Sequence, residues 1–102
     1  MKDITKEIYK RALRLKGETS QIDISIEEAA EFIQSLTKVK RHYESNVSRI
    51  DLINKVAEEA SDLFVMIEQM LITFNIEKQF EESYKNKIKR LIERLDKLEG
   101  GK

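Results

Sequence analysis

Residues 49–74 read RIDLINKVAEEASDLFVMIEQMLITF and contain neither proline nor glycine. Apolar side chains recur through this stretch at the three- and four-residue spacing of an α-helix. Ser48 lies three residues before Asp51, an arrangement that favours the start of a helix because the serine side chain caps a free backbone N–H group. The stretch therefore predicts one long helix from Arg49 to Phe74, the most apolar segment of the chain.

Helix breakers are equally scarce elsewhere, since the 102 residues include three glycines and no proline. Gly17 is placed to end a first helix. Ser20 and Ser25 each precede an acidic residue by three positions, so a second helix is expected to begin between them. The chain is thus predicted to be all-α, a single domain over residues 1–102 folded as a bundle of about four helices. The expected helices cover residues 3–16, residues 20–25 to 43, residues 49–74 and residues 77–98, with a loop at 44–48.

Composition excludes several classes of protein. The absence of cysteine rules out a disulfide scaffold and a thiolate metal site. Nineteen basic residues balance nineteen acidic ones, so no net field attracts nucleic acid or an anionic membrane. No signal peptide and no run of about 20 apolar residues is present. We therefore expect a soluble, cytoplasmic domain with neither nucleic acid nor membrane as its partner.

Acidic residues of the second expected helix lie in an unusual place. At about 100° per residue, Glu28 falls inside the apolar arc, Glu31 lies at its edge and Glu27 points to water. On a surface helix, carboxylates normally lie opposite the apolar face. Glu28 and Glu31 are therefore predicted to face the interior or its border.

The third expected helix repeats the pattern. Glu59 falls among the apolar side chains, Asp62 lies at the edge of the same arc, and Glu58 points outward. Both helices thus present a pair of carboxylates, three residues apart, that faces the interior or its border.

Buried carboxylates are costly, and neighbouring like charges add to the cost. A divalent cation with a preference for oxygen ligands, Mg²⁺ or Mn²⁺, would relieve it. The two pairs therefore predict a metal site clamped between two helices. A simpler alternative stays open, in which Glu28 completes a capping box with Ser25 and Glu59 pairs with Lys55 one turn earlier.

The spacing Glu27-Glu28-x-x-Glu31 followed by Glu59-x-x-Asp62 resembles the signature of the MazG-like, all-α nucleoside triphosphate pyrophosphohydrolases, especially their short phage and Firmicute forms. The similarity extends over most of the chain. The further stretches that resemble this family are residues 17–21, residues 54–63 and the basic residues 87–91.

The resemblance implies an Mg²⁺-dependent enzyme that hydrolyses a ribo- or deoxynucleoside triphosphate between the α- and β-phosphates, giving a monophosphate and pyrophosphate. It implies a catalytic role, as acceptor of the water proton, for Glu28 or Glu31. It also implies a base pocket with an aromatic residue, but the chain has no tryptophan, so base preference stays open. The implied metal ligands are Glu28, Glu31, Glu59 and Asp62. The cations expected on the phosphate oxygens are Lys38, Lys55, Lys87 and Arg90.

The third expected helix is apolar around most of its circumference, especially over residues 63–67 and 70–72. Such a helix must be covered on several sides. The remaining helices of one short chain cannot easily cover it, so the sequence predicts an obligate homodimer. The resemblance adds that a dimer of dimers is a further form, with helices of two chains enclosing each site.

Other functions remain open at this stage. The chain could be a non-catalytic helical bundle that binds or regulates a partner, with its acids serving as caps and ion pairs. The same fold could act on another nucleotide, such as phosphoribosyl-ATP. A di-iron bundle fits less well, because that chemistry uses Glu-x-x-His pairs and His42 is the only histidine.

Overall fold

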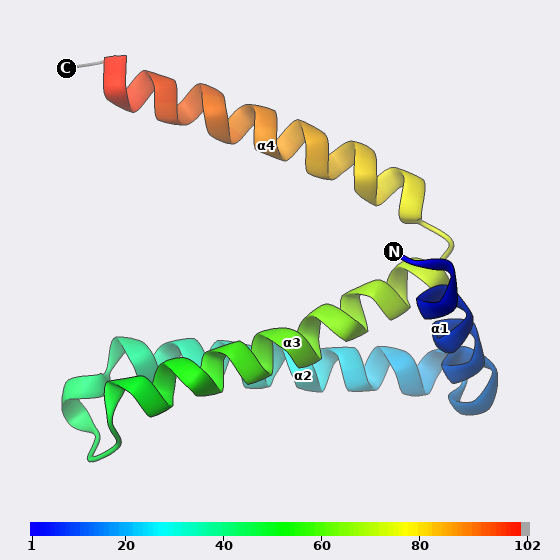
Figure 1. Ribbon diagram of the computed structural model, residues 1–102, viewed down its shortest axis with the longest axis horizontal. Coiled ribbons are helices and arrows are strands. Elements are labelled where there is room, and N and C mark those ends of the chain that lie inside the picture. The colour runs from blue at the N-terminus through cyan, green and yellow to red at the C-terminus, as the bar shows by residue number, and fades with distance from the viewer. Residues whose placement is uncertain (101–102) are drawn as a thin grey trace.

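The computed structural model describes residues 1–100, which form an all-helical chain without β-strands (Figure 1). The predicted all-α fold class is confirmed. Helix boundaries agree with the prediction within a few residues, except at the start of the second helix. The elements are α1 (Asp3–Lys16), α2 (Glu18–Lys40), the short 3-10 helix η1 (His42–Glu44), α3 (Arg49–Thr73) and α4 (Glu77–Gly100).

Helix α2 begins at Glu18, so the predicted start between Ser20 and Ser25 is wrong. Gly17 has a φ of 86°, a backbone conformation that glycine adopts at little cost, and its N–H donates to the Leu13 carbonyl at 2.8 Å. One residue therefore ends α1 and starts α2. Ser25 is inside the helix, where its hydroxyl donates to the Gln21 carbonyl at 2.8 Å.

Both ends of α3 are capped. The predicted cap at its start is confirmed, because the Ser48 hydroxyl accepts a hydrogen bond from the Asp51 N–H at 3.2 Å. At its end, Asn75 adopts a positive φ of 54°, and the N–H of Ile76 donates to the Leu71 carbonyl at 3.0 Å. This is the Schellman arrangement, with asparagine in the place of the usual glycine. The chain therefore turns sharply into α4.

Helices α2 and α3 form an antiparallel hairpin that is the main packed unit of the chain (Figure 1). Buried and half-buried side chains recur along it every seven residues, which is two helical turns and hence one face. On α2 the residues at this seven-residue spacing are all polar, whereas on α3 a single acid interrupts apolar residues. The positions are Gln21, Glu28 and Ser35 on α2 and Leu52, Glu59 and Met66 on α3.

Helix α1 packs across the end of the hairpin where α2 begins and α3 ends (Figure 1). The buried Tyr9 hydroxyl donates to Glu68 Oε1 of α3 at 2.7 Å. Lys6 Nζ lies 3.2 Å from Glu77 Oε2 at the start of α4. These contacts join the N-terminal helix to the turn between α3 and α4.

Helix α4 leaves that turn and diverges from the hairpin, so most of its length contacts no other helix (Figure 1). All residues of α4 from Lys78 to Gly100 are exposed, including the apolar side chains. The radius of gyration is 17.5 Å, whereas a compact chain of this length has one of about 13 Å. One chain by itself therefore leaves much apolar surface in water. Within residues 1–100, none of the helices is both apolar enough and long enough to span a bilayer.

Candidate metal centre

Carboxylates from the two hairpin helices meet near the middle of the hairpin. Glu28 of α2 and Glu59 and Asp62 of α3 each offer one oxygen, and these oxygens lie within 4.8 Å of one another. The i, i+3 spacing on α3 places Glu59 and Asp62 on neighbouring turns of one face. The antiparallel packing then brings that face against Glu28. These are three of the four acids that the sequence singles out as ligands.

Two carboxylate oxygens of this cluster are buried without a hydrogen-bond partner. Glu59 is only 6% exposed, and its Oε2 and the Oε2 of Glu28 are both orphaned. A buried polar atom without a partner costs about 1–3 kcal/mol, and more when it is charged. Glu27 and Glu58, by contrast, are exposed as the helical rotation predicts. The cluster thus has the oxygen atoms of a cation site, and two of them have no hydrogen-bond partner.

Glu31, the fourth acid, is exposed and contacts the same cluster. The pKa of its carboxyl is raised, first because it hydrogen-bonds the carboxyl of Glu59 and then because the charge of Glu28 lies nearby. These interactions place Glu31 beside Glu59 and Glu28, so Glu31 belongs to the cluster.

Lys55 supplies the positive charge that the protein itself brings to the cluster. Its Nζ lies 3.1 Å from Glu59 Oε1 and 3.7 Å from Glu58 Oε2. The pKa of Lys55 is raised, chiefly by the hydrogen bond to Glu59. The simpler alternative for Glu59 is therefore present in the structure, but it satisfies one oxygen and leaves the other orphaned. The capping box of Glu28 with Ser25 does not form, because Ser25 is inside α2.

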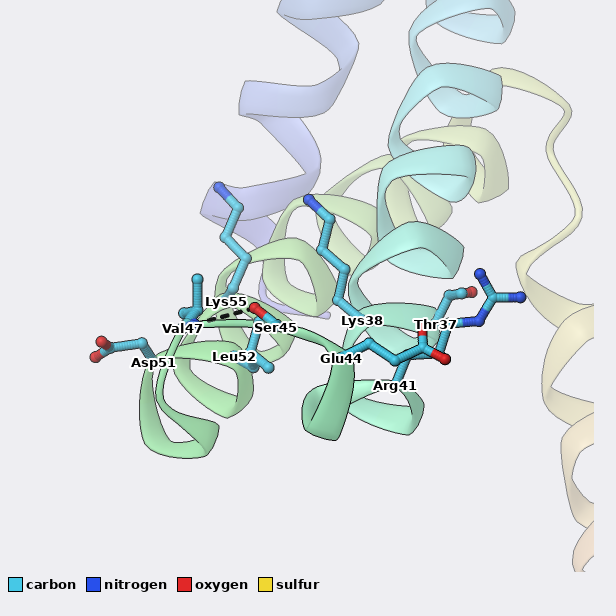
Figure 2. A pocket seen from close by; sticks show the side chains of 9 residues that line it. All are labelled: Thr37, Lys38, Arg41, Glu44, Ser45, Val47, Asp51, Leu52 and Lys55. Carbon is cyan, nitrogen blue, oxygen red and sulfur yellow. Dashed lines mark hydrogen bonds between the residues drawn. The ribbon is translucent and has the colours of Figure 1, made fainter.

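Two cavities extend from this cluster toward the loop that joins α2 to α3. The first has a volume of about 260 Å³ and the second about 560 Å³. Lys38 of α2 and Lys55 of α3 line both cavities, so the two cavities adjoin each other at these lysines. The first is lined by Glu31, Gln34, Ser35, Lys38, Lys55 and Glu59. The second, drawn in Figure 2, is lined by Thr37, Lys38, Arg41, Glu44, Ser45, Val47, Asp51, Leu52 and Lys55.

The remaining predicted site residues lie elsewhere. Lys87 and Arg90 are exposed on α4, which diverges from the hairpin, and they line neither cavity. His42 is exposed beyond the end of α2, with Nδ1 3.2 Å from the Val39 carbonyl oxygen. Within one chain, the structure therefore groups Lys38 and Lys55 with the acids and keeps the α4 cations apart.

Sequence reasoning missed two polar residues of the hairpin interface. Gln21 is 1% exposed, with both amide atoms orphaned, and Ser35 is 4% exposed, with its hydroxyl donating to the Phe32 carbonyl at 2.6 Å. Their signal was their seven-residue spacing from Glu28. For Gln21 this signal was obscured because the start of the helix was left open between Ser20 and Ser25, whereas Ser35 lay inside the expected helix and its spacing was not considered.

Comparison with known proteins adds no relative. The chain matches no protein-family model, no curated protein and no solved structure. The argument for function therefore depends on the site itself.

Proposed function

We propose that this protein is an Mg²⁺-dependent nucleoside triphosphate pyrophosphohydrolase of MazG-like type. The observation that supports this proposal is the acidic cluster between α2 and α3, with its two buried, orphaned oxygens. Three acids whose oxygens lie within 4.8 Å of one another suit a hard divalent ion. The two lysines beside them suit the phosphate oxygens of a nucleotide that the ion leaves uncovered.

Glu28, Glu59 and Asp62 would hold the ion, with Glu31 beside them as a further ligand or as the acceptor of the water proton. When bound, Mg²⁺ or Mn²⁺ neutralises charge on the triphosphate and makes the α-phosphorus more electrophilic. Water attacks the α-phosphorus, the bond to the bridging oxygen of the β-phosphate breaks, and a monophosphate and pyrophosphate leave. The phosphate oxygens accept hydrogen bonds from Lys38 and Lys55.

Glu31 is the better placed acceptor for the proton of the attacking water. It is exposed and lines the small cavity beside Lys38 and Lys55, whereas Glu59 is buried. Glu28 has an orphaned buried oxygen and is better suited to hold the ion.

The working form is proposed to be a homodimer or a dimer of dimers in the cytoplasm. Large apolar side chains are exposed on every helix, among them Ile8, Ile33, Phe64 and Leu91. A second copy that covers these faces would also supply the α4 cations. Lys87 and Arg90 would then reach the phosphates bound to a neighbouring chain.

The test compares Glu59→Gln with the matched variant Glu58→Gln, one residue away and exposed. Each protein is incubated with Mg²⁺ and a panel of ribo- and deoxynucleoside triphosphates, and pyrophosphate release is measured. We expect wild type and Glu58→Gln to be active and Glu59→Gln to lose about 100-fold or more, the usual effect of losing a group that stabilises transition-state charge. Calorimetry of Mg²⁺ binding is run on the same proteins.

Absence of both metal binding and pyrophosphate release in the wild type would exclude this function. Metal binding without release would favour the non-catalytic, regulatory alternative. The exposed apolar face of α4 supports this alternative, because either a partner protein or a second copy of the chain could cover it.

A further inference from the structure

The larger of the two cavities has no role in the chemistry described above. Its volume of about 560 Å³ lies within the range of small-molecule sites, about 300–1,000 Å³, whereas the 260 Å³ cavity lies below it. It is formed by the end of α2, the loop after η1 and the first turns of α3. It is therefore the place beside the acidic cluster with room for a whole organic group.

The two cavities adjoin each other at a pair of lysines. Glu31 and Glu59 line the small cavity, Lys38 and Lys55 line both, and Arg41 lines the large one alone. In Figure 2 the lysine side chains extend from α2 and α3 in the same direction, away from the loop. A ligand in the large cavity therefore meets the lysines before it meets the acids.

The charged residues determine the direction in which a nucleotide can lie across the two cavities. Beyond the lysines the lining includes the carboxylates of Glu44 and Asp51, which repel phosphate. They can accept hydrogen bonds from neutral donors such as sugar hydroxyls. Phosphate therefore belongs beside Lys38 and Lys55, and an uncharged group belongs beside Glu44.

The rest of the lining suits a nucleoside. Val47 and Leu52 supply apolar surface, and Arg41 supplies a planar guanidinium that can stack on a base. The Thr37 hydroxyl already donates to the Ile33 carbonyl at 3.0 Å, so toward a ligand it offers only its lone pairs. The Ser45 hydroxyl accepts from the Val47 N–H at 3.0 Å and keeps its own hydrogen to donate.

We propose that the large cavity binds the base and sugar of the nucleoside triphosphate, with the phosphate chain passing between Lys38 and Lys55 to the acidic cluster. This inference rests on the proposed function, since it concerns the same substrate. None of the residues that line the cavity is aromatic. Discrimination among bases therefore depends on hydrogen bonds at Thr37 and Ser45 and on the shape of the apolar wall.

The test fills the cavity without touching the acids or the lysines. Val47 lies in the loop and is half exposed, so Val47→Trp places a large side chain in the cavity with little strain on the helices. Ile50→Trp is the matched control, because Ile50 lies nearby, is exposed and does not line the cavity. The probes are α,β-methylene analogues of the deoxynucleoside triphosphates and inorganic tripolyphosphate, each titrated with Mg²⁺.

We expect wild type and Ile50→Trp to bind at least one analogue about tenfold or more tightly than tripolyphosphate, a gain of about 1.4 kcal/mol from the nucleoside. Val47→Trp should bind the analogue and tripolyphosphate equally, with its tripolyphosphate affinity unchanged. If Val47→Trp still binds the analogue more tightly than tripolyphosphate, or if the wild type binds the two equally, this inference is wrong while the proposed function stands. A wild type that binds neither probe would remove the proposed function as well.

Hydrogen exchange of the wild-type protein gives a second readout that needs no variant. The analogue should slow exchange of the backbone amides of residues 41–48, and tripolyphosphate should not. Equal protection by the two probes, or none by the analogue, counts against a nucleoside in this cavity.

Discussion

Lys55 Nζ lies 3.1 Å from Glu59 Oε1, one turn away on α3, while Glu59 Oε2 is buried without a partner. Lys55 thus balances the charge of Glu59 through one carboxylate oxygen and leaves the other oxygen without a partner. Lys55 therefore stabilises the cluster when no ion is bound and, under the proposed function, would compete with the ion for it.

The first prediction concerns this competition. Lys55→Met should lower the free energy of unfolding of the metal-free protein by about 1 kcal/mol, because a buried carboxylate loses its charged partner. The same change should tighten Mg²⁺ binding, because a positive charge that repels the ion is removed. It should weaken nucleotide binding, because the phosphate oxygens lose a cationic partner. Denaturant titration and calorimetry measure these effects. Lys85→Met, which removes an exposed pair 3.8 Å from Glu81 on α4, is the control and should change none of the three.

The acidic cluster was predictable because it depends on rotation around a helix, which spacing gives directly. Glu28 and Glu59 were expected to turn inward and Glu27 and Glu58 outward, and their exposure in the structure agrees. The presence of long helices could be predicted equally well, because the chain lacks proline and long stretches keep the apolar spacing of a helix. Local rules were sufficient for these features.

The loop cavity and the start of α2 were not predictable by the same rules. Ser20 offered a good local cap, but the positive φ of Gly17 allows the helix to begin sooner. Arg41 and Val47 share the cavity because of the path that the chain takes from α2 to α3, and spacing does not encode that path. The direction of α4 depends on the turn at Asn75 and on what covers its apolar face.

The second prediction concerns pH. Burial and the hydrogen bond to Glu68 raise the pKa of Tyr9 to about 12, from an ordinary value of 10.0. The folded state holds this proton more tightly than the unfolded state, so the stabilisation is fully present below pH 10.0 and is lost as pH rises through about 12. Unfolding measured across this range should show the loss in wild type and in Tyr84→Phe. Tyr9→Phe should lack that part of the pH dependence, and an unchanged profile would contradict the assignment.

The third prediction concerns assembly. Leu91 and Leu95 are 49% and 47% exposed in a single chain, on a helix that contacts little else. If a second copy covers α4, light scattering at micromolar concentration should give a mass at least twice the chain mass of 12.0 kDa. Leu91→Arg with Leu95→Arg should reduce it to the monomer, because two charges cannot be buried unpaired in the interface. The control Asn86→Arg changes an exposed polar position on the same helix and should leave the mass unchanged. A monomeric wild type would refute the dimer.

The last prediction concerns Gln21, which is 1% exposed and whose amide nitrogen and oxygen have no hydrogen-bond partner. Gln21 lines neither cavity, so nothing in the proposed reaction requires its amide. Gln21→Met keeps the length of the side chain and removes two unsatisfied polar atoms, so it should raise the free energy of unfolding by about 1 kcal/mol with turnover unchanged. Urea titration checks this against Gln79→Met, an exposed position on α4 that should be neutral. A loss of stability in Gln21→Met would instead mean that the amide is satisfied in solution, by water or by a second chain.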